Sequence, residues 1–253
     1  MAESLLPPRS AEVSDVLDAT MRVFRATLPK CMPVALPASL LLMLPNLYWE
    51  TTGKPFDLLG SFDTTFWVLA AVGGLAYQWL AAIIMVQQHN LVEHRGAEVV
   101  VEMREAGRRW ALLVVTAVAA AALIALGVFT LVVPGIFAAV CFSVLRPVVL
   151  FERLGALQSL QRCVQLVRPG WWKVCAAAVI AALTYVVCLL MSIVVVGLLS
   201  GALGAVGLSP EAVKAVGSAC VLGVQAIALV YFSALWLAIY AVVSTHSVAS
   251  SSA

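Results

Sequence analysis

The feature that most constrains this chain is a run of 36 residues, Trp110 to Leu145, that contains no charged side chain. As one helix the run would be about 54 Å long, well beyond the ~30 Å hydrocarbon core of a bilayer. It is interrupted only by Pro134-Gly135, a pair that favours turns. We therefore predict a membrane hairpin whose tight outer turn is formed by Pro134 and Gly135.

Composition extends this membrane assignment to the whole chain. Of the 253 residues, 63% are hydrophobic and 11% are charged, whereas soluble domains average roughly 45–50% apolar and about 25% charged residues. Unbroken Ala, Val and Leu runs favour helices over barrel strands, which need alternating apolar and polar residues. We predict an all-α, polytopic membrane bundle with six transmembrane helices, near residues 31–49, 64–88, 110–132, 136–151, 174–199 and 215–243.

The positive charges divide the connecting segments into two groups. Thirteen of the 15 Lys and Arg lie in residues 1–30, 89–109 and 152–173, once Arg146 at the end of its span is counted with the last segment. Basic loops remain in the cytoplasm during membrane insertion. Both termini are therefore expected on the cytoplasmic side. The net charge of +2 gives no reason to expect nucleic acid as a partner.

The same three segments carry apolar stripes at helical spacing. In the N-terminal segment, residues 1–30, the stripe consists of Val13, Leu17, Met21, Phe24 and Leu28. Amphipathic helices with basic flanks lie in the membrane interface or pack beneath a bundle. A docking surface for another membrane or cytoplasmic protein would show the same pattern, so that alternative stays open.

Three regions follow from these patterns. Residues 1–30 form a cytoplasmic amphipathic segment, residues 31–243 form the transmembrane domain, and the Ser/Ala-rich tail, residues 244–253, is predicted to be disordered.

No catalytic, cofactor-binding or metal-binding motif stands out. His89, Glu93 and His94 form the pattern H-x-x-x-E-H, which matches neither zincin spacing, and positions 89 and 94 lie about 140° apart on a helix. The six cysteines form no C-x-x-C pair, and phosphate-binding glycine loops are absent. We therefore expect a protein that is not an enzyme and has no cofactor or metal.

Polar residues inside the predicted spans are few. No Asp, Glu or His lies at the centre of a span, which argues against a proton-coupled pump. Arg146 lies within reach of the headgroups, either as an interfacial anchor or as a contact for a lipid phosphate or a partner. Gln78 and Gln225 lie near mid-span, where amides most often form interhelical hydrogen bonds. A pocket for a polar substrate is the alternative interpretation of the two glutamines.

Several short stretches carry a resemblance to a known family. They are Val133-Pro134-Gly135-Ile136, Arg146-Pro147-Val148-Val149-Leu150-Phe151-Glu152, Ala156-Leu157-Gln158-Ser159 and Val167-Arg168-Pro169-Gly170-Trp171-Trp172-Lys173. Together they resemble the membrane domain attached to some bacterial glycerophosphoryl diester phosphodiesterases and the related YciC-like multi-span proteins. The resemblance implies a helical bundle in a bacterial inner membrane. It does not imply hydrolysis, because a soluble catalytic barrel has no room within these 253 residues.

These observations favour a non-catalytic bacterial inner-membrane protein that acts as a scaffold or accessory subunit in envelope or lipid-related processes. The alternative is a transporter of a lipid or small apolar solute that uses the proline-rich first span and Gln78 or Gln225. A weaker hypothesis is a membrane enzyme acting through Arg146, Glu152 and Arg162. The same three residues are our candidates for a lipid or partner contact.

The predicted topology can be tested by cysteine labelling. Single cysteines replacing Asp57 and Arg104, in a background without the six native cysteines, should react with a membrane-impermeant maleimide from opposite sides of the membrane. The positive-inside distribution places these two positions on opposite faces. Reaction of both from one side would contradict the six-span topology.

Overall fold

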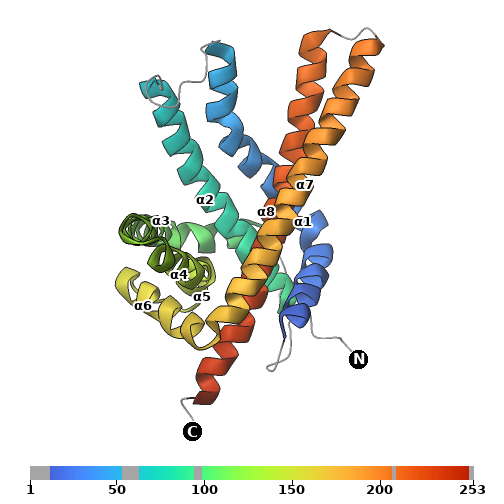
Figure 1. The fold of residues 1–253 in the computed structure, drawn as a ribbon. Helices are drawn as coiled ribbons and strands as arrows, with labels where there is room; N and C mark the ends of the chain where they lie inside the picture. Colours follow the sequence, from blue (N-terminus) through green and yellow to red (C-terminus); the bar gives the residue numbers. More distant parts are fainter. Residues whose placement is uncertain (1–11, 53–62, 94–98, 207–208, 251–253) are drawn as a thin grey trace.

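The computed structural model describes residues 12–52, 63–93, 99–206 and 209–250, and all regular structure in these ranges is helical (Figure 1). Six segments are long and apolar enough to cross a membrane. The predicted all-α membrane bundle with six candidate spans is therefore confirmed. The helices are α1 (Val13–Thr52), α2 (Thr64–Val92), α3 (Val99–Thr130), α4 (Val132–Phe142), α5 (Leu145–Phe151), α6 (Ala156–Val167), the short 3-10 helix η1 (Arg168–Gly170), α7 (Trp171–Ala205) and α8 (Pro210–Ser250).

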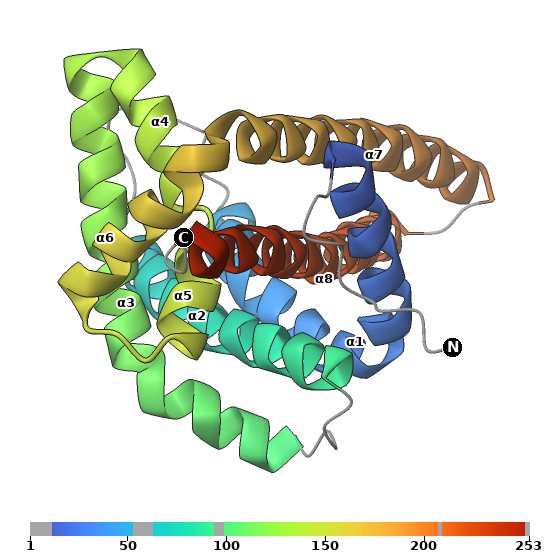
Figure 2. The same ribbon diagram turned by 90° about the horizontal axis from the view of Figure 1, so that it is seen from below.

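Two groups of helices cross each other. The long helices α1, α2, α7 and α8 run mainly along the vertical of Figure 1, where α3 and α4 are seen nearly end-on. Figure 2 shows α3 lengthwise, with α4 beside its distal half. Helix α1 packs against both α2 and α8, and α3 packs against α4. The short helices α5 and α6 connect the two groups, and the start of α1 and the end of α8 lie toward the same end of the molecule.

The N-terminal amphipathic segment is continuous with the first span in a single helix, α1. This helix contains Pro29, Pro33, Pro37 and Pro45, and each proline removes a backbone donor and bends the helix. Figure 2 shows the two parts of α1 running in different directions. The segment before the prolines therefore runs at an angle to the span while remaining helical.

The most deeply buried residues of this segment lie beside the predicted stripe, of which Val13, Leu17, Phe24 and Leu28 are partly buried and pack against the core. The buried residues are Val16, Ala19, Thr20, Val23 and Thr27, whereas Met21 of the predicted stripe is exposed. The two sets lie roughly 100° apart around the helix. Small and β-branched residues are buried because they allow the backbone of α1 to approach its neighbours closely, a requirement that a count of large apolar residues does not detect.

The hairpin turn also lies earlier than predicted. The chain reverses at Leu131, whose backbone is extended, so Pro134 and Gly135 belong to the first turn of α4 rather than to the turn itself. Proline is tolerated in a first turn because its missing N–H has no helical acceptor there. A Cβ atom at Gly135 would overlap Cγ2 of Val128 and lie 2.7 Å from the backbone nitrogen of the same residue. Gly135 is therefore required for the close contact between α3 and α4.

The predicted fourth span, residues 136–151, is interrupted. Helix α4 ends at Phe142 and α5 begins at Leu145. In an uninterrupted helix the ring of Pro147 would clash with the carbonyl of Ser143, four residues earlier. The Ser143 hydroxyl instead donates to the carbonyl of Val140 at 2.7 Å. The two helical pieces and the break together make up the fourth candidate span, Val132–Phe151.

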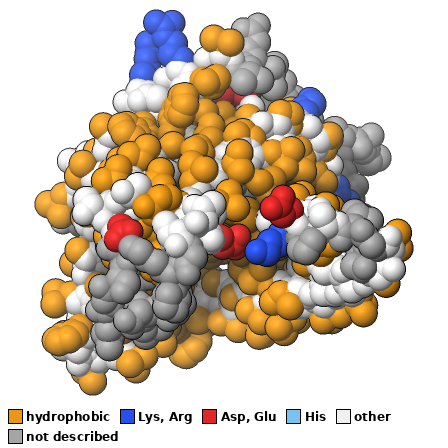
Figure 3. Space-filling view, turned by 90° about the horizontal axis from the view of Figure 1, so that it is seen from above, with side chains coloured by type: hydrophobic (Ala, Val, Ile, Leu, Met, Phe, Trp, Pro, Cys, Tyr) orange, Lys and Arg blue, Asp and Glu red, His pale blue; other side chains and the backbone are white. Residues whose placement is uncertain are grey.

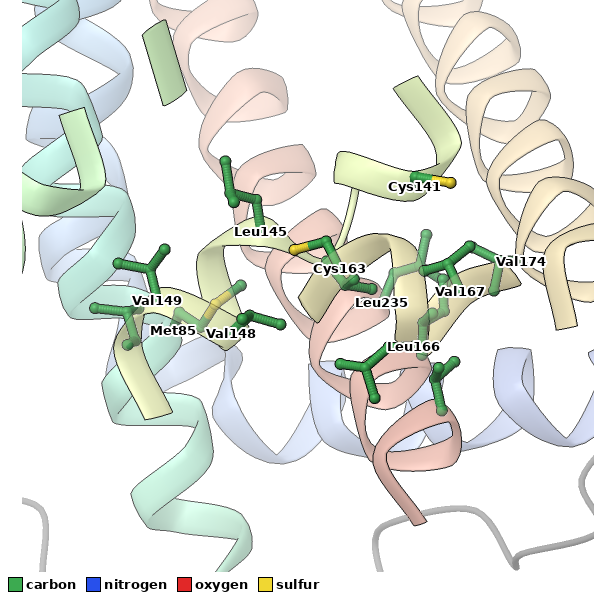
Figure 4. Close-up of a cluster of buried hydrophobic side chains, with 14 of the residues drawn as sticks. Met85, Cys141, Leu145, Val148, Val149, Cys163, Leu166, Val167, Val174 and Leu235 are labelled. Carbon is green, nitrogen blue, oxygen red and sulfur yellow. The ribbon is translucent and has the colours of Figure 1, made fainter. Parts of the chain in front are cut away.

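The largest buried cluster gathers around α5. Leu145, Val148 and Val149 pack against Met85 of α2 and Leu235 of α8 (Figure 4). Side chains from α6 and α7 also belong to the cluster, namely Cys163, Leu166, Val167 and Val174. All eight α-helices contribute buried residues to this core.

Elsewhere the surface is apolar. Figure 3 shows hydrophobic side chains covering most of one face, with only a few charged ones. Large side chains of α7 such as Leu183, Leu190 and Leu198 are exposed, as is Phe129 near the end of α3, at 93%. Water disfavours such a surface, whereas lipid tails solvate it. The protein is therefore a multi-pass membrane protein whose outer surface contacts the bilayer.

The prediction of a disordered tail is wrong for residues 244–250. Helix α8 continues to Ser250, so residues 244–250 are helical, and the remainder of the tail, 251–253, lies outside the described residues.

Two adjacent glycines test the packing of α1 on α2. A Cβ atom at Gly73 would lie 2.6 Å from the backbone oxygen of Leu41, whereas one at Gly74 would meet no heavy atom within 4 Å. Gly73→Ala should lower the free energy of unfolding by about 1–3 kcal/mol, because the backbone of Leu41 cannot easily move away from the added methyl group. Gly74→Ala should leave it unchanged or raise it by up to about 1 kcal/mol. Denaturation of the purified protein in detergent measures both, and equal stabilities would contradict this packing.

Candidate functional site

Arg146 is the polar residue of α5, a helix whose other side chains are apolar and mostly buried. It is the second residue of α5, where Leu145 and Pro147 to Leu150 are all buried. Its Nη2 donates a hydrogen bond of 2.9 Å to Oε1 of Gln78 in α2. The guanidinium carbon also lies 5.9 Å from the ring centroid of Tyr77. These two contacts from α2 fix the direction of the guanidinium.

A cavity of about 480 Å³ opens beside this arginine. Arg146, Gln78 and Ser143 are its polar residues. The remaining wall is apolar, and alanines from three helices leave the space that larger side chains would fill; they are Ala117, Ala120, Ala121, Ala139 and Ala178. Leu113, Ile124, Phe142 and Trp236 complete the apolar wall. The cavity thus combines a cationic group with a hydrocarbon-like lining.

The break between α4 and α5 produces this arrangement. Ser143 and Leu145 at the break both line the cavity, and Arg146 follows directly. A guanidinium has five N–H donors, and here one nitrogen is engaged by Gln78. No carboxylate of the described ranges lies within ion-pair distance of Arg146. The cavity is therefore chemically suited to the anionic group of an amphiphile.

Glu152 and Arg162 form a second polar arrangement. The Nε of Arg162 lies 2.8 Å from Oε2 of Glu152, and the Tyr240 hydroxyl donates to Oε1 of the same carboxylate at 3.3 Å. These contacts connect the end of α5 to α6 and α8. Of the three residues that the sequence proposed as one contact set, the structure pairs Glu152 with Arg162, whereas Arg146 bonds to Gln78 instead.

The remaining candidates from the sequence occupy separate places. Nε2 of His89 lies 3.2 Å from Oε1 of Glu93, and the His89 ring packs on Phe151 with the centroids 4.1 Å apart. His94 lies outside the described residues. Gln225 does not line the Arg146 cavity. Within the described ranges, no group of three or more His, Cys, Asp or Glu residues could hold a metal ion.

Sequence reasoning missed one buried polar contact that joins three helices. Gln88 of α2 is fully buried, and its Nε2 donates to the carbonyl of Val230 at 3.0 Å and to the Thr27 hydroxyl at 3.4 Å. The signal was the polar pair Gln87-Gln88, which follows the apolar run Ala81 to Val86 at the end of the predicted second span. Such amides stabilise contacts between membrane helices.

No known protein family, curated protein or solved structure matches this chain. The resemblance described from the sequence therefore stays a prediction.

The contact between α5, α6 and α8 can be tested by substitution. Glu152→Gln should lower the free energy of unfolding by about 1–2 kcal/mol, because the partly buried guanidinium of Arg162 loses its counter-charge. Tyr240→Phe, which removes one long hydrogen bond, should cost less than about 1 kcal/mol. Denaturation in detergent measures both. A double-mutant cycle of Glu152→Gln with Arg162→Gln supplies the control, and a coupling energy of zero would contradict the ion pair.

Proposed function

We propose that this protein is a non-catalytic membrane protein that binds a membrane lipid in the Arg146 cavity, as a scaffold or accessory subunit in envelope or lipid-related processes. The observation that carries the proposal is the cavity itself, where a guanidinium without an ion-pair partner in the described chain borders an apolar, alanine-lined space. A charged side chain at membrane depth is costly unless an opposite charge or water compensates it.

A phospholipid has both groups that this cavity can accommodate, an anionic phosphate and an apolar acyl chain. Its phosphate would accept hydrogen bonds from the guanidinium nitrogens that Gln78 leaves available, in the geometry that favours arginine over lysine. An acyl chain would cover the walls formed by the alanines, Leu113 and Trp236. Binding would then exchange lipid–lipid contacts for closely similar lipid–protein contacts, so the selectivity would come from the headgroup.

The chemistry of the cavity supports a binding role over catalysis. Its polar side chains are an amide, a hydroxyl and a guanidinium, from Gln78, Ser143 and Arg146. None of the three is a general base at neutral pH. Among the described residues that line the cavity there is no histidine or carboxylate to activate the Ser143 hydroxyl, which donates to the Val140 carbonyl.

The proposed location is a bacterial inner membrane with both termini in the cytoplasm. This orientation is supported by the 13 Lys and Arg of the three basic segments. It also agrees with the start of α1 and the end of α8 lying toward one end of the molecule (Figure 1).

A transporter of a lipid or small apolar solute is the second candidate. The observation that favours it is the interruption of the fourth span beside the cavity, because transporters often place their substrates at discontinuous membrane helices. The prolines of α1 would then allow one part of the bundle to move against the other. Uptake of a fluorescent phospholipid into proteoliposomes separates this candidate from a static binding role.

Lipid binding can be tested with the intact protein in detergent. Native mass spectrometry of protein mixed with phosphatidylglycerol should show one tightly held lipid. Arg146→Gln should weaken this binding about tenfold or more, because a charge-assisted hydrogen bond to the phosphate is lost. Ala121→Trp, which fills the cavity, should remove it. Arg104→Gln, an exposed position of α3 outside the cavity, is the control. Equal lipid retention by Arg146→Gln and Arg104→Gln would contradict the proposal.

A further inference from the structure

A second pocket, separate from the Arg146 cavity, lies between the N-terminal half of α3 and the α5–α6 connection. Its volume is about 540 Å³, and none of its lining residues is shared with the Arg146 cavity. The residues that decide its chemistry are Arg108, Arg109 and Glu105 from α3 and Arg153 from the connection. Two basic segments that are more than 40 residues apart in the sequence thus meet at one site.

The charges of this pocket are unbalanced. Three guanidinium groups face one carboxylate, and none of the three forms an ion pair with a residue of the described ranges. Nη1 of Arg109 donates to the carbonyl of Val149 in α5 at 3.0 Å, which holds this guanidinium at the pocket wall. Like charges gathered without counter-charges repel each other. An anion in the pocket would remove that repulsion.

The backbone of Arg153 gives an independent indication. Its φ of 55° is the single positive value among the described non-glycine residues. Arg153 directly follows the C-cap of α5, Glu152, where helices commonly end in a left-handed residue that is usually glycine. An arginine in that conformation is strained, because its Cβ atom crowds the backbone. Strained residues of this kind cluster at functional sites. At such a site the function of the side chain outweighs the cost of the strained backbone.

We propose that the pocket formed by Arg108, Arg109 and Arg153 binds a phosphate group. Planar guanidinium groups match the oxygens of a phosphate in paired hydrogen bonds, and several of them around one site favour a group with more than one negative charge. The phosphate belongs either to a lipid headgroup or to a soluble phosphate compound, and both present the same oxygens. This site does not depend on the Arg146 cavity, and either site can fail without the other.

Arg153→Gly is the informative variant. Glycine adopts the left-handed conformation without strain, so the variant should be as stable as the wild type or more stable while lacking one guanidinium. Its affinity for phosphate should fall about tenfold, since one charge-assisted contact is lost. Arg108→Gln should have a similar effect on affinity. Arg104→Gln, which lies on the same helix outside the pocket, should have none.

Binding is measured on the full chain in nanodiscs by the rise in thermal unfolding temperature. One arm adds inorganic phosphate to nanodiscs of phosphatidylcholine, and the other replaces part of that lipid by phosphatidic acid. Stabilisation in the second arm alone identifies a lipid phosphate, and stabilisation in the first identifies a soluble one. In either arm the gain should shrink in Arg153→Gly and Arg108→Gln but persist in Arg104→Gln. No stabilisation in either arm, or an equal gain in Arg153→Gly and the wild type, would overturn the proposal.

Discussion

The packing of α5 is the interaction on which the rest of this structure depends. This helix has only seven residues, yet its apolar side chains contact α2, α3, α6 and α8. Isolated helices of this length are unstable in water, so α5 owes its structure to the elements around it. Its position fixes Arg146 against α2 and Glu152 against α6 and α8. Both candidate binding sites lie beside it.

A bilayer imposes the second constraint, because lipid offers backbone groups no hydrogen bonds. The break between α4 and α5 is therefore compatible with a membrane only where protein surrounds it. Val144 and Leu145 are buried, and the Ser143 hydroxyl bonds locally to the Val140 carbonyl. The α3–α4 hairpin packs beside the break, and Gly135 in α4 allows α4 to pack closely against α3. The same hairpin supplies much of the cavity wall, so the break and the cavity have one structural origin.

Much of the fold could be predicted from the sequence because the bilayer acts on local properties. The uncharged runs and their lengths predicted the helical class and the six candidate spans, which the structure confirms. The break at Ser143 had a local signal in Pro147, four residues later, but a count of apolar residues does not detect it. Four residues of the predicted α1 stripe do pack against the core, but the sequence pattern did not show that the small and β-branched residues beside them, such as Ala19 and Val23, are the more deeply buried ones.

The sites were less predictable because they depend on contacts between distant segments. Arg146 stood out as an ionisable residue in an apolar segment, and Gln78 as a mid-span amide, but nothing local indicated that they bond to each other. Glu152 and Arg162 were proposed with Arg146 and instead pair with each other. The pocket of Arg153 joins α3 to the α5–α6 connection, and its strained backbone is visible only in three dimensions.

The central claim is that an acyl chain occupies the cavity beside Arg146. The most direct measurement is photocrosslinking of the intact protein in nanodiscs with a phospholipid that carries a diazirine near the end of one acyl chain. We expect crosslinks concentrated on the cavity walls, in peptides containing Ala117 to Ile124 and Ala139 to Phe142, that unlabelled phospholipid suppresses. Crosslinks spread evenly over exposed apolar helices such as α7, with no enrichment at the cavity, would contradict it.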